Sequence, residues 1–266
     1  MCGIYLTNIP LEKGKLEYKL EGIAHRGPDF TGILQQDNLS FGHTRLSILD
    51  LDSRSNQPMI HEDYVLVFNG EIYNYKTIKK ELQELGENFS TQGDSEVLLV
   101  GYKRWGKALV PKLNGMFAFS IYDKKNNEVF SARDRLGVKP FYYSWDKGVF
   151  EICSQIKPLS DGKTVDQEAV EIYLQTGYVP SPWSIYKEVK KLKPGFTMTM
   201  SLTNQEIDFE QYWELQTPQQ TDLSYEEAKE KLHELLKDAI KIRLNSDVSY
   251  GSFLSGGIDS ALVSAI

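Results

Sequence analysis

The second residue of the chain is a cysteine, in the sequence Met1-Cys2-Gly3-Ile4. Methionine aminopeptidases remove an initiator Met that precedes a small residue, and this removal would place an α-amino group and a thiol on Cys2. An N-terminal nucleophile can use its own amine as the general base, and free amines and thiols titrate close together, near about 8 and about 8.5. Cys2 is therefore a candidate nucleophile, although a small buried residue that opens a strand would give the same pattern.

Three other positions offer the groups that a thiol needs to attack an amide, namely oxyanion donors and substrate anchors. Asn69-Gly70 follows the apolar run 65–68 and provides a side-chain amide and a backbone N–H. Arg45 can bind a carboxylate through two N–H groups, and Asp94 can bind an ammonium group. Each has an ordinary structural alternative, which is an Asn-Gly turn, a salt bridge and a helix cap respectively, and the local sequence leaves these open.

A glycine-rich loop, Ser255-Gly256-Gly257-Ile258-Asp259-Ser260, lies between an expected strand at 250–254 and a helix. Glycines in this position let backbone N–H groups approach a phosphate, and the helix N-terminus favours an anion. The loop lacks the Gly-Lys-Ser/Thr ending of the Walker A motif, which disfavours a γ-phosphate-transferring NTPase. We interpret it as a phosphate-binding loop rather than a simple turn.

The composition of the 266 residues restricts the class of protein. A net charge of -7 without a long basic run disfavours nucleic acid and anionic membranes as partners. The only two cysteines, Cys2 and Cys153, are far apart in sequence, which excludes a disulfide framework and favours the cytoplasm. No apolar stretch is long enough to span a membrane, and we expect no signal peptide and no structural metal site. Cys153 lies in a strand-like run and is predicted to be a core residue.

The first two hundred residues read as strands interrupted by helices. Short β-branched or aromatic runs predict strands at 2–7, 39–46, 64–72, 117–123, 128–134, 141–145 and 149–154. Apolar spacing predicts helices at 75–85, 95–105 and 166–175, and a short one near 111–113. Strands on each side of a helical pair predict an α+β fold with sheets covered by helices.

The composition and the hydrophobic pattern of the sequence change after Tyr212. Residues 216–221 are polar and turn-prone, as in a linker, and Ser224 with Glu227 forms a capping-box pattern before an amphipathic helix. A strand–loop–helix unit follows, but one such unit cannot bury a parallel sheet. We therefore expect a first domain at 2–215, a linker at 216–223, and an incomplete α/β domain at 224–266 in a fragment of a longer protein.

Together these motifs resemble the glutamine-hydrolysing asparagine synthetases, which belong to the class II, N-terminal nucleophile amidotransferases. The matching segments come in family order and cover nearly all of the first domain. They are Met1-Cys2-Gly3-Ile4, His25-Arg26-Gly27-Pro28-Asp29, Arg45-Leu46-Ser47-Ile48-Leu49-Asp50, Phe68-Asn69-Gly70-Glu71-Ile72-Tyr73-Asn74, Gly93-Asp94-Ser95-Glu96, Leu113-Asn114-Gly115-Met116-Phe117-Ala118 and Arg133-Asp134-Arg135-Leu136-Gly137-Val138-Lys139-Pro140. The resemblance implies a four-layer αββα glutaminase domain, followed by the first helix and strand of an ATP-pyrophosphatase domain.

The resemblance also implies a role for each site residue. Cys2 would attack the side-chain amide of glutamine and form a γ-glutamyl thioester, while Asn69 and the Gly70 N–H hold the oxyanion. Arg45 would bind the α-carboxylate, and Asp94, helped by Glu71, the α-amino group. The backbone of Leu46, Ser47, Ile48 and Leu49 would line the glutamine pocket.

The second domain of such enzymes uses the ammonia that the first releases. The glutaminase needs no cofactor, whereas the synthetase uses ATP and Mg²⁺ to activate aspartate as an aspartyl-adenylate. The positions that match its ATP-contacting stretch are Leu254, Ser255, Gly256, Gly257, Asp259 and Ser260. A homodimer is compatible with the resemblance. The chain as given should at most hydrolyse glutamine.

Three alternatives remain open. Relatives with both motifs amidate a sugar carboxylate or a secondary-metabolite acid instead of aspartate. A phosphoribosyl-pyrophosphate or hexosamine amidotransferase shares the first domain, but the Gly-rich loop disfavours it. A non-catalytic glutamine-binding module would be expected to lack at least one of Cys2, Arg45, Asn69 and Asp94, and all four are present.

Overall fold

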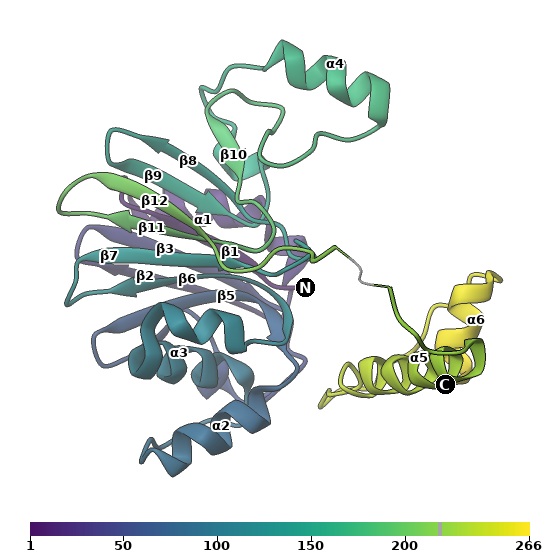
Figure 1. The fold of residues 1–266 in the computed structure, drawn as a ribbon. Coiled ribbons are helices and arrows are strands. Elements are labelled where there is room, and N and C mark those ends of the chain that lie inside the picture. Colours follow the sequence, from purple (N-terminus) through teal and green to yellow (C-terminus); the bar gives the residue numbers. More distant parts are fainter. Residues whose placement is uncertain (218–219) are drawn as a thin grey trace.

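The computed structural model describes residues 1–217 and 220–266. The predicted linker at 216–223 therefore falls partly on residues 218–219, which lie outside the described residues. The ribbon consists of two packed sheets with helices around them, followed by a helical segment that carries the C-terminus (Figure 1).

Both sheets are antiparallel and have six strands each. In the first sheet the strand order is β10 (Val189–Lys191), β8 (Tyr142–Asp146), β9 (Val149–Cys153), β1 (Gly3–Thr7), β3 (Leu39–Arg45) and β2 (Phe30–Gln36). In the second sheet it is β12 (Glu206–Gln211), β11 (Phe196–Ser201), β7 (Glu128–Arg133), β6 (Gly115–Asp123), β5 (Tyr64–Ile72) and β4 (Met59–His61).

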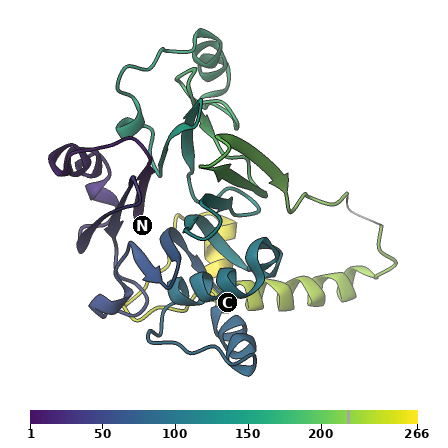
Figure 2. The ribbon, with the colours of Figure 1, turned by 90° about the vertical axis from the view of Figure 1, so that its left-hand side faces the viewer.

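The two sheets pack face to face and each is covered by helices on its outer side (Figures 1 and 2). Between the sheets lies a core to which both contribute, including Ile4 and Phe41 from the first and Val67 and Val129 from the second. Leu16 and Leu20 of α1 (Lys13–Glu21) pack on the other face of the first sheet. The second sheet is covered by α2 (Tyr75–Glu84) and α3 (Asp94–Trp105). The predicted four-layer αββα architecture is confirmed.

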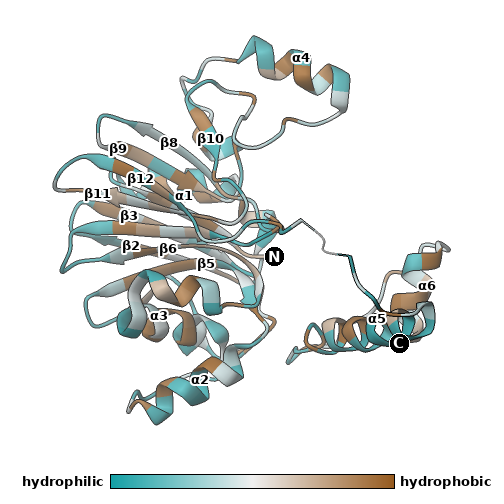
Figure 3. Cartoon of the chain, viewed as in Figure 1, coloured by the Kyte–Doolittle hydropathy of each residue, from teal (hydrophilic) through white to brown (hydrophobic). Residues whose placement is uncertain are grey.

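The alternation of side chains along the strands explains these layers. Every residue of β1 and β3 is buried, because one face of each strand meets the other sheet and the opposite face meets α1. Hydrophobic residues accordingly run along the strands (Figure 3). The helix α2 buries one side only, through Tyr75, Ile78 and Leu82, whereas every residue of α3 from Asp94 to Tyr102 is buried. Cys153 is fully buried in β9, as predicted.

The predicted strands and helices of the first 160 residues are present within one or two residues of their expected bounds, and the segment near 111–113 is a 3-10 helix at Gly106–Lys112. The helix predicted at 166–175 is α4 (Gln167–Thr176), which stands away from both sheets (Figure 1). The sequence patterns did not predict α1 or the strands β2, β4, β10, β11 and β12. Most of these are edge strands, whose polar, exposed residues carry little hydrophobic periodicity.

The C-terminal part differs from expectation in one respect. The capping box is present, with Ser224 and Glu227 bonded reciprocally at the start of α5 (Tyr225–Lys241), and α6 (Ile258–Ala265) follows the Gly-rich loop. The strand predicted at 250–254 is wrong, because these residues are irregular in the structure. A strand needs a neighbour for its backbone hydrogen bonds, and no other strand lies beside this segment in the described part of the chain.

No helix among the described residues 1–217 and 220–266 is long and apolar enough to cross a bilayer.

The turn after β7 is held by a single buried carboxylate. Asp134, which is 1% exposed, accepts hydrogen bonds from the backbone N–H groups of Phe117, Leu136, Val138 and Lys139 at 2.9–3.2 Å. Four donors on one carboxylate fix the path of the chain from β7 back toward the sheet edge. This turn places Lys139 beside the pocket described below.

We predict that Asp134→Ala lowers the free energy of unfolding by about 3 kcal/mol, because it leaves four N–H groups without their acceptor, of which those of Phe117 and Lys139 are buried. Asp134→Asn keeps one acceptor oxygen and should cost less. Asp146→Ala, at an exposed strand end, is the matched control and should change stability by less than about 0.5 kcal/mol. Urea unfolding measures all three, and equal stabilities of Asp134→Ala and Asp146→Ala would contradict the role of this carboxylate.

Candidate active site

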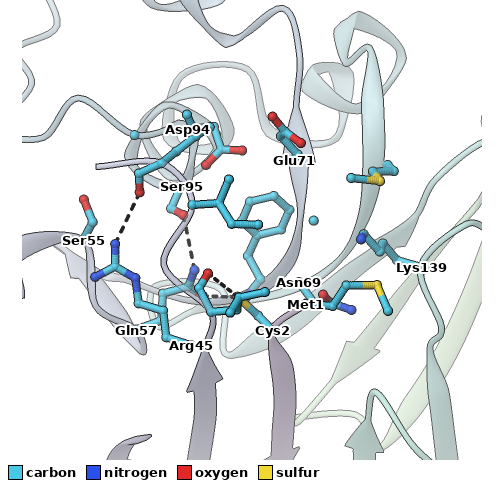
Figure 4. Close-up of a pocket in the computed structure, with 17 residues that line it drawn as sticks. Met1, Cys2, Arg45, Ser55, Gln57, Asn69, Glu71, Asp94, Ser95 and Lys139 are labelled. Carbon is cyan, nitrogen blue, oxygen red and sulfur yellow. Dashed lines mark hydrogen bonds between the residues drawn. The ribbon is translucent and has the colours of Figure 1, made fainter. Parts of the chain in front are cut away.

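A pocket of about 110 Å³ opens where β1, β3 and β5 come together (Figure 4). Cys2 immediately precedes β1, Arg45 ends β3, and Asn69 with Gly70 lies in β5. Eight of the predicted glutamine-site residues line the pocket together with Cys2: Arg45, Leu46, Ile48, Leu49, Asn69, Gly70, Glu71 and Asp94. Ser47 does not line it, because this residue turns outward and its N–H donates to the Asp29 carboxylate at 2.7 Å.

Cys2 is held by two hydrogen bonds, one through its thiol and one through its backbone carbonyl. Its Sγ donates to the Leu46 carbonyl at 3.7 Å, and the Cys2 carbonyl accepts from Arg26 Nε at 2.9 Å. Burial raises the pKa of the Cys2 thiol, so it is protonated at neutral pH and needs a base before it can attack.

The amine that could act as this base is on Met1 in the chain as it stands. Burial lowers the pKa of the Met1 α-amino group; the Cys2 thiol raises it, whereas the cationic side chains of Lys139 and Arg26 lower it further. Met1 also lines the pocket, so its removal would both free the α-amine of Cys2 and enlarge the space beside the thiol.

The edge of β5 provides an unused backbone donor. The β4 strand pairs with β5 only as far as Leu66, so the N–H groups of Phe68, Gly70 and Ile72, which point away from β6, have no strand partner. Phe68 N donates to Gln57 Oε1 at 2.6 Å, and Ile72 N donates to Asp94 Oδ2 at 2.8 Å. The Gly70 N–H lies between them and has no acceptor among the described residues, so it is free to bind a ligand in the pocket.

Glycine is required at position 70 by close packing. A Cβ there would lie 2.3 Å from the Met116 carbonyl oxygen and 2.7 Å from Phe117 Cα. Any side chain would push β5 away from β6 and move the free N–H. The Asn-Gly pair is therefore part of a strand, and the alternative of a simple turn is wrong.

The Asn69 amide is oriented by two partners. In the orientation that satisfies both of its polar atoms, Nδ2 donates to the Cys2 carbonyl at 3.0 Å and Oδ1 accepts from Arg26 Nη2 at 3.3 Å. The second hydrogen of Nδ2 stays available. Asn69 and Gly70 thus present two neighbouring N–H donors beside the Cys2 thiol, which is the arrangement that an oxyanion needs.

Arg45 is a buried cation without an anionic partner in the described chain. Its two Nη atoms donate to the carbonyls of Leu49, Asp50 and Asp52 and to Asn56 Oδ1, and it is only 6% exposed. The salt-bridge alternative is therefore wrong. Because neutral oxygens do not cancel its charge, the guanidinium favours an anion in the pocket.

Two carboxylates lie at another side of the pocket (Figure 4). The N-cap of α3 is Gly93 and Asp94 is the first residue of the helix, so Asp94 is not the N-cap residue. Burial raises the pKa of Asp94 to about 6 despite backbone donors, the first of which is Ile72 N. Burial, with the charge of Asp94, raises the pKa of Glu71 to about 7, and Glu71 Oε1 is buried without a partner in the described residues.

The charges of the pocket therefore match a zwitterion. A buried guanidinium without an anion, and the carboxyl groups of the buried Asp94 and the half-buried Glu71 without a bonded cation, are costly to the folded protein. An α-amino acid would supply both missing partners, with its carboxylate toward Arg45 and its ammonium toward Asp94 and Glu71. The nucleophile and the two N–H donors lie beside the same space.

Some pocket residues were not predicted as site residues. Ser55, Gln57, Ser95, Met116 and Lys139 line the pocket, and Arg26 holds Cys2 and Asn69 from outside it. Arg26 and Lys139 lie in sequence motifs that the family shares, but nothing in the sequence distinguishes their side chains from ordinary surface cations. Gln57 carries no sequence signal, because its contacts with Phe68 and Ser95 exist only in the fold.

The Gly-rich loop lies apart from this pocket. Leu254, Ser255, Gly256, Gly257, Asp259 and Ser260 do not line it. Gly256 has φ +84 with nothing within 4 Å of an added Cβ, Gly257 is the N-cap of α6, and the hydroxyls of Ser255 and Ser260 are 3.0 Å apart. This open, left-handed turn before a helix fits a phosphate group. No cluster of three or more His, Cys, Asp or Glu side chains that could hold a metal ion occurs in the described ranges.

We predict that Glu71→Gln makes the stability of the chain less dependent on pH. Glu71 keeps its proton up to about 7 when folded but releases it near about 4.3 when unfolded, so between these values the folded chain binds more protons and its unfolding free energy falls as pH rises. Gln cannot titrate, and Asp94 is common to both proteins. In urea unfolding from about pH 5 to about pH 8, the free energy of unfolding of Glu71→Gln should therefore rise relative to that of the unmutated chain. If the two free energies changed in parallel with pH, the raised pKa of Glu71 would be contradicted.

Known proteins show the same organisation. Residues 1–213 match the family model of the glutamine amidotransferase domain, and residues 231–266 match that of asparagine synthase. A Methanocaldococcus jannaschii protein, provisionally named glutamine-hydrolysing asparagine synthetase 2, is 39% identical over 99% of this chain and 56% of its own length. The glutamine-hydrolysing asparagine synthetase 1 of Bacillus subtilis is 36% identical over 92% of this chain and 39% of its own length.

The chain thus spans about half of these relatives or less. In the glutamine phosphoribosylpyrophosphate amidotransferase structure from B. subtilis, the match has a TM-score of 0.59 at 19% identity and covers 80% of this chain and 49% of that one. At this identity the likeness supports the fold alone. The match over residues 1–213 establishes that the chain belongs to the family of glutamine amidotransferase domains, and a start of asparagine synthase follows it.

Proposed function

We propose that Cys2, once Met1 is removed, hydrolyses glutamine to glutamate and ammonia through a γ-glutamyl thioester. The observation that carries this proposal is one pocket in which a thiol and two N–H donors adjoin the buried cation Arg45 and the carboxyl groups of the buried Asp94 and the half-buried Glu71. Only a substrate with an amino-acid zwitterion satisfies these charges together.

The reaction begins with proton transfer from the Cys2 thiol to its own α-amine. In the chain that retains Met1, burial and then the cations Lys139 and Arg26 lower the pKa of the α-amine. The α-amine of Cys2 would lie near the same cations, which would favour the neutral form that accepts the proton. Sγ then attacks the amide carbon, and the oxyanion accepts from Asn69 Nδ2 and Gly70 N. Each such donor lowers the barrier by about 3 kcal/mol.

Collapse of the tetrahedral species breaks the carbon–nitrogen bond of the amide. The ammonium of Cys2 returns its proton to the leaving nitrogen, and ammonia departs. Water then attacks the thioester carbon while the same amine accepts a proton from it. Glutamate leaves and Sγ recovers its proton, so the enzyme returns to its starting state.

We further propose that the whole protein uses this ammonia to amidate aspartate with ATP and Mg²⁺. The names of the relatives favour aspartate over the other acceptors considered. Leu254, Ser255, Gly256, Gly257, Asp259 and Ser260 would hold the ATP phosphates, and ATP would supply the activation of the acceptor carboxylate. The proposed division is a glutaminase at 2–215, a linker at 216–223 and a synthetase that starts at 224.

We predict that ammonia is released from glutamine only by chains that lack Met1. Retained Met1 blocks the α-amine of Cys2 and lines the pocket, and Cys2→Ala removes the nucleophile, so both forms should be inactive. Cys153→Ala is the matched control, because this other thiol is fully buried in β9 and should not be needed. Ammonia assays with N-terminal mass measurement decide the matter, and equal hydrolysis by the Met1-retaining form would refute the mechanism.

We also predict strong selectivity for the zwitterion. Analogues of glutamine that lack either the α-amino group or the α-carboxylate should each lose about 10- to 150-fold in kcat/KM, the value of one hydrogen bond to a charged group. The amine-free analogue should lose least below about pH 6, where Asp94 and Glu71 are protonated. Equal kcat/KM for glutamine and both analogues would show that these charges do not bind substrate.

A further inference from the structure

A short segment after α5, residues 243–247, crosses back to the glutaminase pocket. The chain after α5 runs beside the first domain in Figure 2. Asp247 N donates to the Ile48 carbonyl at 2.9 Å, and Asp247 Oδ2 accepts from Asp50 N at 2.7 Å. Asp50 and Asp247 are 197 residues apart in sequence, and Asp247 lies in the part that matches asparagine synthase.

These two bonds act on the loop that forms one wall of the pocket. Residues 46–50 belong to no helix or strand, so their backbone groups depend on side chains and on other segments. Ile48 O and Asp50 N flank Leu49, which lines the pocket, and Asp247 satisfies both. Asp247 thereby fixes the backbone of the loop at both Ile48 and Asp50, much as the hydrogen bonds of a neighbouring strand would.

The same segment also contacts the residues that follow β5 in the chain. The Arg243 guanidinium lies 4.9 Å from the centre of the Tyr73 ring, and Lys76 Nζ donates to Asn245 Oδ1 at 3.1 Å. Tyr73 directly follows β5, the strand that carries Gly70. The 243–247 segment therefore bridges the 46–50 loop and the end of the oxyanion strand.

We propose that Asp247 is a positioning residue, which holds the 46–50 loop in the form that binds glutamine. The inference rests on the proposed glutaminase function, and it assigns a residue of the 243–247 segment a part in glutamine binding.

The test compares Asp247→Ala with Asp247→Asn in the full chain after removal of Met1, that is, in residues 2–266. Asp247→Ala removes the acceptor for Asp50 N and should raise KM for glutamine about tenfold while kcat stays within about twofold. Asp247→Asn keeps an acceptor oxygen and should restore most of the affinity. Asp238→Ala is the matched control, since it also removes one negative charge but this carboxylate makes no contact in the described residues.

The same variants are titrated with glutamine in a Cys2→Ala background, which should bind without turnover. If the Met1-free chain with both Cys2 and Asp247 intact releases no ammonia although its Cys2→Ala form binds glutamine, the hydrolysis proposal fails, and a weaker Kd for Asp247→Ala still supports the positioning role. An unchanged KM and Kd in Asp247→Ala would overturn the inference. A loss that appears in kcat alone, or that Asp247→Asn does not restore, would overturn it as well.

Discussion

The active-site geometry depends on the free edge of β5. Because β4 ends opposite Leu66, the next outward N–H groups of β5 must find partners elsewhere. Gln57 and Asp94 satisfy those of Phe68 and Ile72, which holds the strand straight and leaves the Gly70 donor exposed to the pocket. The packing of Gly70 against Met116 and Phe117 allows no side chain that would cover this donor.

The pocket around this edge stores unbalanced charge. Arg45 and Asp94 are held in a low-dielectric site by hydrogen bonds to neutral groups, and Glu71 Oε1 is buried without a partner in the described residues, so each loses hydration without gaining a counter-ion. The folded protein is less stable for it, and a zwitterionic substrate bound as proposed would recover part of that free energy. Such a site is prepared for its ligand before the ligand arrives, which reduces the reorganisation needed for catalysis.

Much of this could be predicted from the sequence. The long buried strands such as β5 and β6 have strong apolar patterns, and Cys2, Arg45, Asn69 and Asp94 stand in motifs whose order is informative. Edge strands such as β12, with mostly exposed residues, have no such pattern. The roles of Gln57 and Arg26 depend on contacts between distant segments, which no local pattern encodes. The expected strand at 250–254 had the right residues but no neighbouring strand.

The sequence also did not indicate how the two parts of the chain meet. Asp247 occurs in a polar turn, Asn245-Ser246-Asp247, that reads as an ordinary connection. Its bonds to Ile48 and Asp50 arise only from the tertiary fold. They join the wall of one catalytic pocket to the start of the region that matches another enzyme domain, so the two parts are mechanically connected.

The central claim is that Cys2 is acylated during turnover. The most direct measurement is mass spectrometry of the Met1-free chain after rapid mixing with glutamine and acid quenching, which preserves a thioester. We predict a mass increase of one glutamyl group on the N-terminal peptide that contains Cys2, and none on the peptide that contains Cys153. A chain that releases ammonia while Cys2 stays unmodified would contradict the account.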